Sequence, residues 1–171
     1  MDNLKTKEAD FMALYNPVHA RFERFCRARV YGDMLYKDLM HDAILIAYEK
    51  LGTLKNREAF LHFLFGIAIR VLANANRKKK PERITEDKLV LFIEDEDHRA
   101  EKKDDLEVLY LGLAALSEDM REALILFEIS GFSIAEIAEL QKVSISAVKQ
   151  RLVRGRRDLM AALSEMGVTQ K

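Results

Sequence analysis

Tryptophan is absent from the 171 residues, and cysteine and proline occur only once and twice. The single cysteine, Cys26, excludes an intramolecular disulfide, and together with four scattered histidines it gives no spacing typical of a metal site. No apolar run approaches the roughly 20 residues that span a bilayer, and the first five residues lack the apolar stretch of a signal peptide. We therefore expect a cytoplasmic chain without a disulfide, a bound metal or membrane insertion.

The residue arrangements on which common enzymes depend are missing as well. There is no Ser/His/Asp or Cys/His set and no glycine-rich phosphate loop. Cys26 fits a buried apolar residue better than a catalytic thiol. The sequence predicts a protein that is not an enzyme and that uses no cofactor.

Seven glycines, two prolines and few β-branched runs favour helices along the whole chain. Apolar residues make up 49% of the chain and charged residues 33%, which is a soluble globular composition. The length suffices for one medium domain or two small helical ones. We expect an all-α protein of two small helical domains joined by an acidic linker, with a helix-turn-helix in the C-terminal domain.

The net charge is zero, but the charge is unevenly distributed. Residues 1–80 hold 15 Lys/Arg and 9 Asp/Glu, residues 81–130 hold 6 and 15, and residues 131–171 hold 7 and 4. Two basic blocks therefore flank an acidic middle, a pattern that keeps nucleic-acid binding open despite the neutral total.

Apolar residues recur at helical spacing in the first block, with Pro17, Asp33 and either Thr53 or Asn56 expected near helix starts. Gly32, Gly52 and Pro81 are expected to end helices. Residues 81–104 are acidic and weakly periodic, which is typical of a solvated linker, although residues 88–93 form an apolar island that should dock on this chain or on a partner. The predicted domains are residues 1–80 and 106–171, with a linker at 81–105.

Residues 133–140 and 144–163 predict a helix-turn-helix, with Ser133 and Ser144 as caps. The spacing of the second helix places Ile145, Val148 and Leu152 on a buried side and Ser146, Gln150 and Val153 on the opposite side. Such a helix fits the major groove, where Gln suits adenine and Arg suits guanine. Arg151, nearer the buried side, is expected to reach a phosphate. An ordinary helical hairpin with a solvated basic face is the alternative. The residues expected to contact DNA are Ser144, Ser146, Ala147, Lys149, Gln150, Arg151, Arg154 and Arg157.

Two further groups of residues lie in the first block. The helix after Phe60 ends in basic and amide side chains, and an exposed aromatic such as Phe65 beside them could stack on unpaired bases, although such aromatics usually belong to the core. Asp38, His41 and Asp42 share one helix face, either as a solvated surface or as a docking surface for a basic partner.

Taken together, these segments resemble extracytoplasmic-function sigma factors of the sigma-70 family. Residues 38–51 look like the family's polymerase-binding helix, residues 60–80 like its promoter-melting and minus-10 helix, and residues 115–152 like its minus-35 module. The order and spacing of the three segments carry the resemblance, which covers residues 8–80 and 106–163.

The resemblance implies roles for these groups. Asp38, His41 and Asp42 would contact core RNA polymerase, and the helix-turn-helix would bind promoter DNA at the minus-35 element. An anti-sigma factor would hold such a protein inactive. The minus-10 strand would be read by Lys55, Asn56, Phe65, Arg70, Asn74, Arg77 and Lys78.

The sequence departs from the family pattern at several positions. Histidine stands at 41 where the family usually has glutamine, and Gly66, Ile69 and Arg70 replace residues of different character. Lys142 occupies a turn position that is often glycine, where a positive φ would cost about 1 kcal/mol. A stand-alone helix-turn-helix regulator and a degenerate sigma-like protein that binds polymerase but melts promoters poorly remain as alternatives.

Overall fold

The computed structural model describes residues 2–31, 35–78 and 105–167, and every regular element in these ranges is a helix. The prediction of an all-α fold is confirmed. The linker predicted at 81–105, the apolar island at 88–93 and the cap Asp33 lie outside the described residues, apart from residue 105, which begins a helix.

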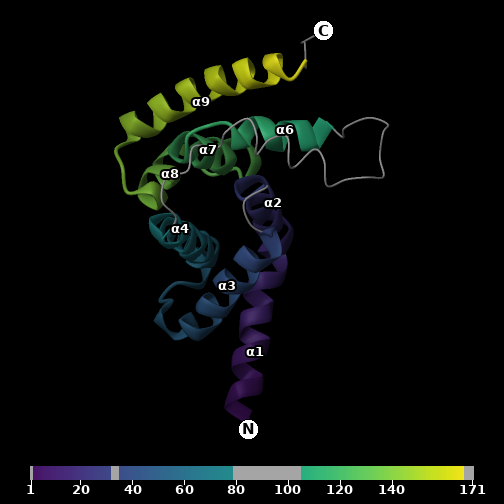
Figure 1. Cartoon of the computed structure of the whole chain (residues 1–171). Coiled ribbons are helices and arrows are strands. Elements are labelled where there is room, and N and C mark those ends of the chain that lie inside the picture. Colours follow the sequence, from purple (N-terminus) through teal and green to yellow (C-terminus); the bar gives the residue numbers. More distant parts are fainter. Residues whose placement is uncertain (1, 32–34, 79–104, 168–171) are drawn as a thin grey trace, which may run out of the picture.

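The N-terminal half consists of four α-helices: α1 (Asp2–Tyr15), α2 (His19–Arg29), α3 (Tyr36–Glu49) and α4 (Phe60–Lys78). Helix α1 projects away from the body, and only its C-terminal end reaches the core (Figure 1). There Phe11 packs edge-on against Tyr48 and Phe60, with ring centroids 5.5 and 5.6 Å apart. Aromatic contacts therefore hold α1 to α3 and α4.

Short 3-10 turns connect these helices at the predicted boundaries. Pro17 lies in the turn Asn16–Val18, which leads into α2. The Asn56 side chain accepts a hydrogen bond from the Glu58 backbone N–H and caps the turn Arg57–Ala59 before α4, so Asn56 opens this helix as one of the two predicted residues. Helix α3 ends at Glu49, slightly before the predicted stop at Gly52.

The C-terminal half contains α6 (Asp105–Ala114), α7 (Glu118–Leu124), which continues into a π-turn (Ile125–Ile129), α8 (Ile134–Gln141) and α9 (Ile145–Glu165). Helix α9 runs across the outer side of α7 and α8 (Figure 1). At the crossing, a Cβ on Gly155 would lie 3.0 Å from Leu124 Cδ1, so any larger residue would require the Leu124 side chain to shift. Gly131 has φ +73°, which glycine adopts without strain, and lies in the turn before α8.

One hydrophobic core runs through both halves. The fully buried ring of Phe65 meets the buried rings of Phe22 and Phe25 and also Phe132, which lies after the π-turn, with the Phe65 and Phe132 centroids 4.9 Å apart. The two halves therefore pack directly on each other in this structure.

Helix α4 and the turn before it, Arg57–Lys78, are long and apolar enough to cross a membrane by length and composition. In this structure the same apolar face packs against α3 and α8, with Phe60, Leu64 and Leu72 buried. This is how the central helix of a globular domain uses such a face.

Lys142 has φ 55° and ψ 47° at the C-terminus of α8, the left-handed conformation expected for this turn position. We predict that Lys142→Gly raises the free energy of unfolding by about 1 kcal/mol, because glycine adopts this conformation without the Cβ clash. Urea denaturation followed by circular dichroism measures the change. Lys142→Ala, which removes the charge but keeps the Cβ, should give no such gain, and an equal gain would contradict the strain at this position.

Candidate nucleic-acid interface

The helix-turn-helix forms as predicted, and side-chain caps fix both of its helices. Ser133 accepts a hydrogen bond from the Glu136 N–H while Glu136 accepts one from the Ser133 N–H at 2.7 Å, a complete capping box. The backbone N–H of Ser133, and more weakly His62, lower the pKa of the Glu136 carboxyl. Ser144 caps α9 through the Ala147 N–H. These caps set where α9 begins and therefore which of its side chains face outward.

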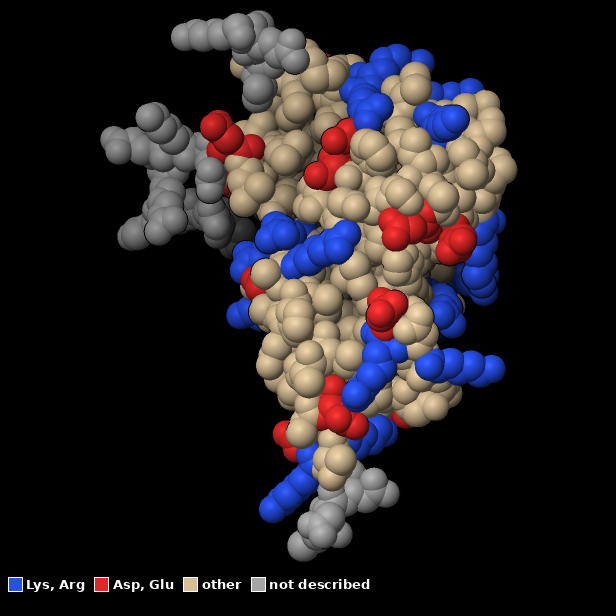
Figure 2. Space-filling view, turned by 180° about the vertical axis from the view of Figure 1, so that it is seen from behind, with Lys and Arg blue, Asp and Glu red and all other residues tan. Residues whose placement is uncertain are grey.

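The outer face of α9 is basic and polar. Ser144, Ser146, Lys149, Gln150, Arg154 and Arg157 are exposed, and Ala147 is half-buried. Lys149, Gln150 and Arg154 have no hydrogen bond or ion pair with the described part of the chain, whereas Arg157 pairs with Asp158 at 2.8 Å. Figure 2 shows Lys and Arg side chains gathered at the top of the molecule, the end that α9 occupies.

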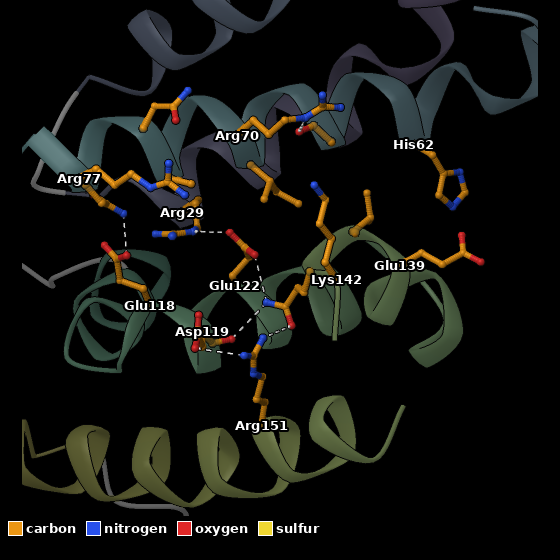
Figure 3. A pocket seen from close by; sticks show the side chains of 17 residues that line it. Arg29, His62, Arg70, Arg77, Glu118, Asp119, Glu122, Glu139, Lys142 and Arg151 are labelled. Atoms are coloured by element: carbon orange, nitrogen blue, oxygen red, sulfur yellow. Dashed lines mark hydrogen bonds and ion pairs between the residues drawn. The ribbon is translucent and has the colours of Figure 1, made fainter. Parts of the chain in front are cut away.

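Arg151 does not share this face. Its guanidinium donates to Gln141 Oε1 at 2.9 Å and to Asp119 Oδ2 at 3.1 Å, so the side chain lies against α7 and α8 (Figure 3). Gln141 in turn donates to Glu122 Oε1 at 3.0 Å. The structure thus assigns Arg151 an internal partner, where the sequence had suggested a phosphate contact.

Ile145 also departs from its predicted place. The helical spacing puts it on the buried side of α9, but 50% of the residue is exposed. Ile145 is the first residue of α9, so it lies at the end of the helix and not in the middle of its packed side. The expectation that it belongs to the core is wrong.

On α4 the structure separates the predicted residues into an exposed group and a buried one. Arg70, Asn74, Arg77 and Lys78 are exposed, as are Lys55 and Asn56 before the helix. Phe65 is fully buried between Phe22, Phe25 and Phe132, so the expectation of an exposed base-stacking ring is wrong. The C-terminal half packs on this side of α4, and the spacing of apolar residues within α4 does not predict that contact.

A cavity of about 710 Å³ lies between α4 and the helices α7 and α8. Figure 3 shows Arg70, Arg77 and Lys142 on its walls together with Glu118, Asp119 and Glu139. Asn76 donates to Glu118 across one side at 2.6 Å, and His62 meets Glu136 of α8 at 3.0 Å. Charges of both signs line this space, and Arg70, Asn74 and Arg77, which were predicted to read the minus-10 strand, face acidic side chains of α7 and α8 across it.

The face predicted to bind a partner lies on α3. Asp38, His41 and Asp42 are all exposed, and Leu45 beside them is 58% exposed. No group of three or more possible metal ligands occurs among the described residues.

Comparison with known proteins identifies the family of the chain. The family description "Sigma-70, region 4" matches residues 106–159, which include the helix-turn-helix. The RNA polymerase sigma-H factor of Pseudomonas aeruginosa is 29% identical over 143 residues, 76% of this chain and 74% of that protein. The ferric citrate uptake sigma factor FecI of Escherichia coli is 26% identical over 155 residues, 87% and 88% of the two chains. The ECF RNA polymerase sigma-E factor of Escherichia coli is 24% identical over 131 residues, 70% and 69%. The chain is an extracytoplasmic-function sigma factor of the sigma-70 family.

This sigma factor shares its fold with solved structures over nearly its whole length. The sigma factor RpoE of Bartonella quintana, in complex with the anti-sigma factor NepR, superposes with a TM-score of 0.71 at 23% identity, covering 91% of this chain and 97% of that one. CnrH, in complex with the cytosolic domain of CnrY, gives 0.65 at 21% identity, covering 92% and 90%. The likeness therefore extends to the N-terminal half, which the region 4 match does not reach.

Polar contacts between the two halves of this sigma factor were not predicted from the sequence. Arg29 Nε lies 3.4 Å from Glu122 Oε2, and the two side chains are only 5% and 11% exposed. Arg21 also donates to the Ser130 carbonyl oxygen. The burial of Arg29 could have been predicted from the sequence. Arg29 follows Phe22 and Cys26 at helical spacing and so lies on the apolar face of α2.

We predict that Glu122→Ala lowers the free energy of unfolding of this sigma factor by about 3–5 kcal/mol, because it leaves the buried Arg29 guanidinium without its charged partner. Arg29→Met combined with Glu122→Leu should lose much less, since neither charge is then left unpaired. Urea denaturation of both variants tests the pair. Equal losses in the single and the double variant would show that packing, and not charge, holds this contact.

Proposed function

We propose that this sigma factor binds core RNA polymerase and directs it to promoters, reading the minus-35 element with α9 and the minus-10 element with α4. The observation that carries the proposal is the capped helix-turn-helix with an exposed basic face, in a chain of the sigma-70 family. The protein catalyses no bond chemistry itself, acts in the cytoplasm and does not insert into the membrane.

The domain arrangement follows from these two DNA contacts. Residues 1–80 form the polymerase and minus-10 unit, residues 81–105 the linker and residues 106–171 the minus-35 unit. The direct packing of the halves through Phe65 and Phe132 means that a separation of the two units would expose new apolar surface on both.

At the minus-35 element, α9 enters the major groove with its N-terminal turns. Gln150 and Arg154 are exposed without partners among the described residues, so they are free to meet base edges. Lys149 and Arg157 flank them and suit phosphates. Ser144, Ser146 and Ala147 lie at the start of the helix, where the backbone approaches the DNA most closely.

At the minus-10 element, the exposed side of α4 and the loop before it offer charge and amide groups to an opened strand. Arg70, Arg77 and Lys78 supply the charge, and Asn74 supplies an amide. Lys55 and Asn56 extend this surface at the start of the helix. Phe65 is left out, because its ring belongs to the core.

The partners include core RNA polymerase, promoter DNA and an anti-sigma factor. Asp38, His41 and Asp42, with the exposed Leu45, form a surface that is acidic with an apolar neighbour, which suits a basic docking helix of polymerase. An anti-sigma partner is proposed because RpoE and CnrH, which share the fold, were solved with the anti-sigma factor NepR and with CnrY.

The polymerase contact predicts the effect of charge reversal on α3. Asp38→Lys combined with Asp42→Lys should strongly reduce retention of core RNA polymerase and leave the helical content unchanged, because both residues are exposed. Pull-down with purified core enzyme and circular dichroism measure the two quantities. Glu49→Lys combined with Glu58→Lys makes the same change in net charge at other exposed positions and should retain polymerase. If the Asp variant binds as well as the unaltered chain, α3 is not the docking helix.

The minus-35 contact predicts that single side chains control base preference. Gln150→Ala and Arg154→Ala should each reduce discrimination at one or two base pairs by about 1–3 kcal/mol, whereas Lys149→Ala should weaken all duplexes alike and lower the salt slope by roughly one unit. Affinities of holoenzyme for promoter duplexes with intact and scrambled minus-35 elements, over a salt series, separate these effects.

The matched control for this series is Arg156→Ala, since Arg156 lies on the same helix but pairs with Glu128 at 2.7 Å and stacks over Phe127. It should change neither base preference nor salt slope. Run-off transcription from the same promoters tests the whole function. If every variant keeps the sequence preference of the unaltered chain, α9 is not the helix that reads the minus-35 element.

A further inference from the structure

One edge of the outer face of α9 carries a row of apolar side chains beside the charged ones. Ile145 is 50%, Val153 66% and Met160 43% exposed. At 100° per residue, Val153 lies about 80° and Met160 about 60° around the helix from Ile145, and Ile145 itself lies about 20° from the buried Leu152 on the other side. The three therefore run along the edge between the buried side and the outer face of α9. Lys149 and Gln150 precede Val153 by one turn, and Arg157 follows it by one turn, so this strip borders the proposed DNA-reading surface.

None of the three belongs to the buried side of α9. The inner side of α9 is formed by Val148, Leu152 and Gly155, all buried against the rest of the C-terminal half. Valine is also a poorer helix former than lysine, arginine or glutamine, so an exposed Val153 contributes nothing to the stability of α9. Isolated exposed apolar residues are common on protein surfaces, but these three are aligned on the face of a helix built for DNA.

The major groove contains one apolar group that such side chains can recognise. Thymine presents its C5-methyl group there, whereas the other base edges present hydrogen-bond donors and acceptors. Lys149, Gln150 and Arg154 suit phosphates and the polar edges, and an aliphatic side chain among them suits the methyl group.

We infer that Ile145 and Val153 each contact the 5-methyl group of a thymine in the minus-35 element, so that this sigma factor requires thymine at two positions there. The inference rests on the proposed minus-35 function of α9. The two residues are eight apart, about 12 Å along the helix, and therefore reach different base pairs. Met160 lies about 22 Å from the start of α9, farther than the roughly 12 Å width of the major groove, and should not read a base.

The test removes single methyl groups from the DNA. Holoenzyme made from core RNA polymerase and the full chain first selects its preferred sequence from duplexes with a randomised upstream element. Each thymine of that element is then replaced singly by uracil, which lacks only the 5-methyl group. At two positions the affinity of the unaltered holoenzyme should fall about fourfold, the effect expected for one buried methyl group.

Variants then assign each position to a residue. Val153→Ala should abolish the uracil effect at one position and Ile145→Ala at the other, while Met160→Ala, an apolar truncation in the same strip, should preserve both. Because the side chains of Ile145 and Val153 are at least half exposed, these variants should keep the circular dichroism spectrum of the unaltered chain.

The outcomes separate this inference from the function on which it rests. A selected element without thymine, or one whose affinity is unchanged by every uracil substitution, overturns the methyl contacts while minus-35 recognition stands. A uracil effect that survives in both Val153→Ala and Ile145→Ala assigns the methyl groups to other residues and overturns it too. If the selection enriches no sequence at all, minus-35 recognition by α9 fails and the inference fails with it.

Discussion

The packing of Phe65 against Phe132, together with the buried ion pair of Arg29 and Glu122, sets how the two halves of this sigma factor lie against each other. Phe65 also meets Phe22 and Phe25, so the ring from α4 sits in a pocket made by both halves. A buried charge without its partner costs several kcal/mol, so Arg29 and Glu122 are stable in this place only when both halves are in register. The aromatic rings supply the apolar burial of this interface, and the ion pair supplies its alignment.

From this contact a continuous chain of polar groups leads to the DNA-reading helix. Arg29 meets Glu122, Glu122 accepts from Gln141, and Gln141 accepts from Arg151 on α9. Arg151 is thereby held on the inner side of α9, and the outer side is left to Gln150 and Arg154. Two sets of contacts thus fix the orientation of α9: the apolar crossing at Gly155 and this chain of polar groups.

Features that depend on neighbours in sequence were predictable, and features that depend on the other half of the chain were not. Ser133, Ser144 and Asn56 were found as caps because a cap acts on the next two or three residues. Phe65 was misplaced because its cover comes from Phe132, 67 residues later. Ile145 was misplaced because a helical wheel gives angles but not how a residue at the helix end is covered. The wheel put Arg151 near the buried side, where it lies, but could not show that Asp119 and Gln141 hold its guanidinium. The roles of Asp38 and of the α4 surface came from resemblance, since spacing alone left a solvated face equally open.

The burial of Cys26 makes the chain suitable for labelling at introduced cysteines. Its thiol is fully buried, and burial raises its pKa, so the reactive thiolate is scarce at neutral pH. A maleimide dye should therefore ignore the native cysteine, and the unaltered chain can serve as its own background. Cysteines introduced at exposed positions such as Lys50 on the N-terminal half and Ala161 on α9 would carry a donor and an acceptor fluorophore. Energy transfer between them would then report the distance between the halves in solution, with and without polymerase, in a protein that needs no residue removed first.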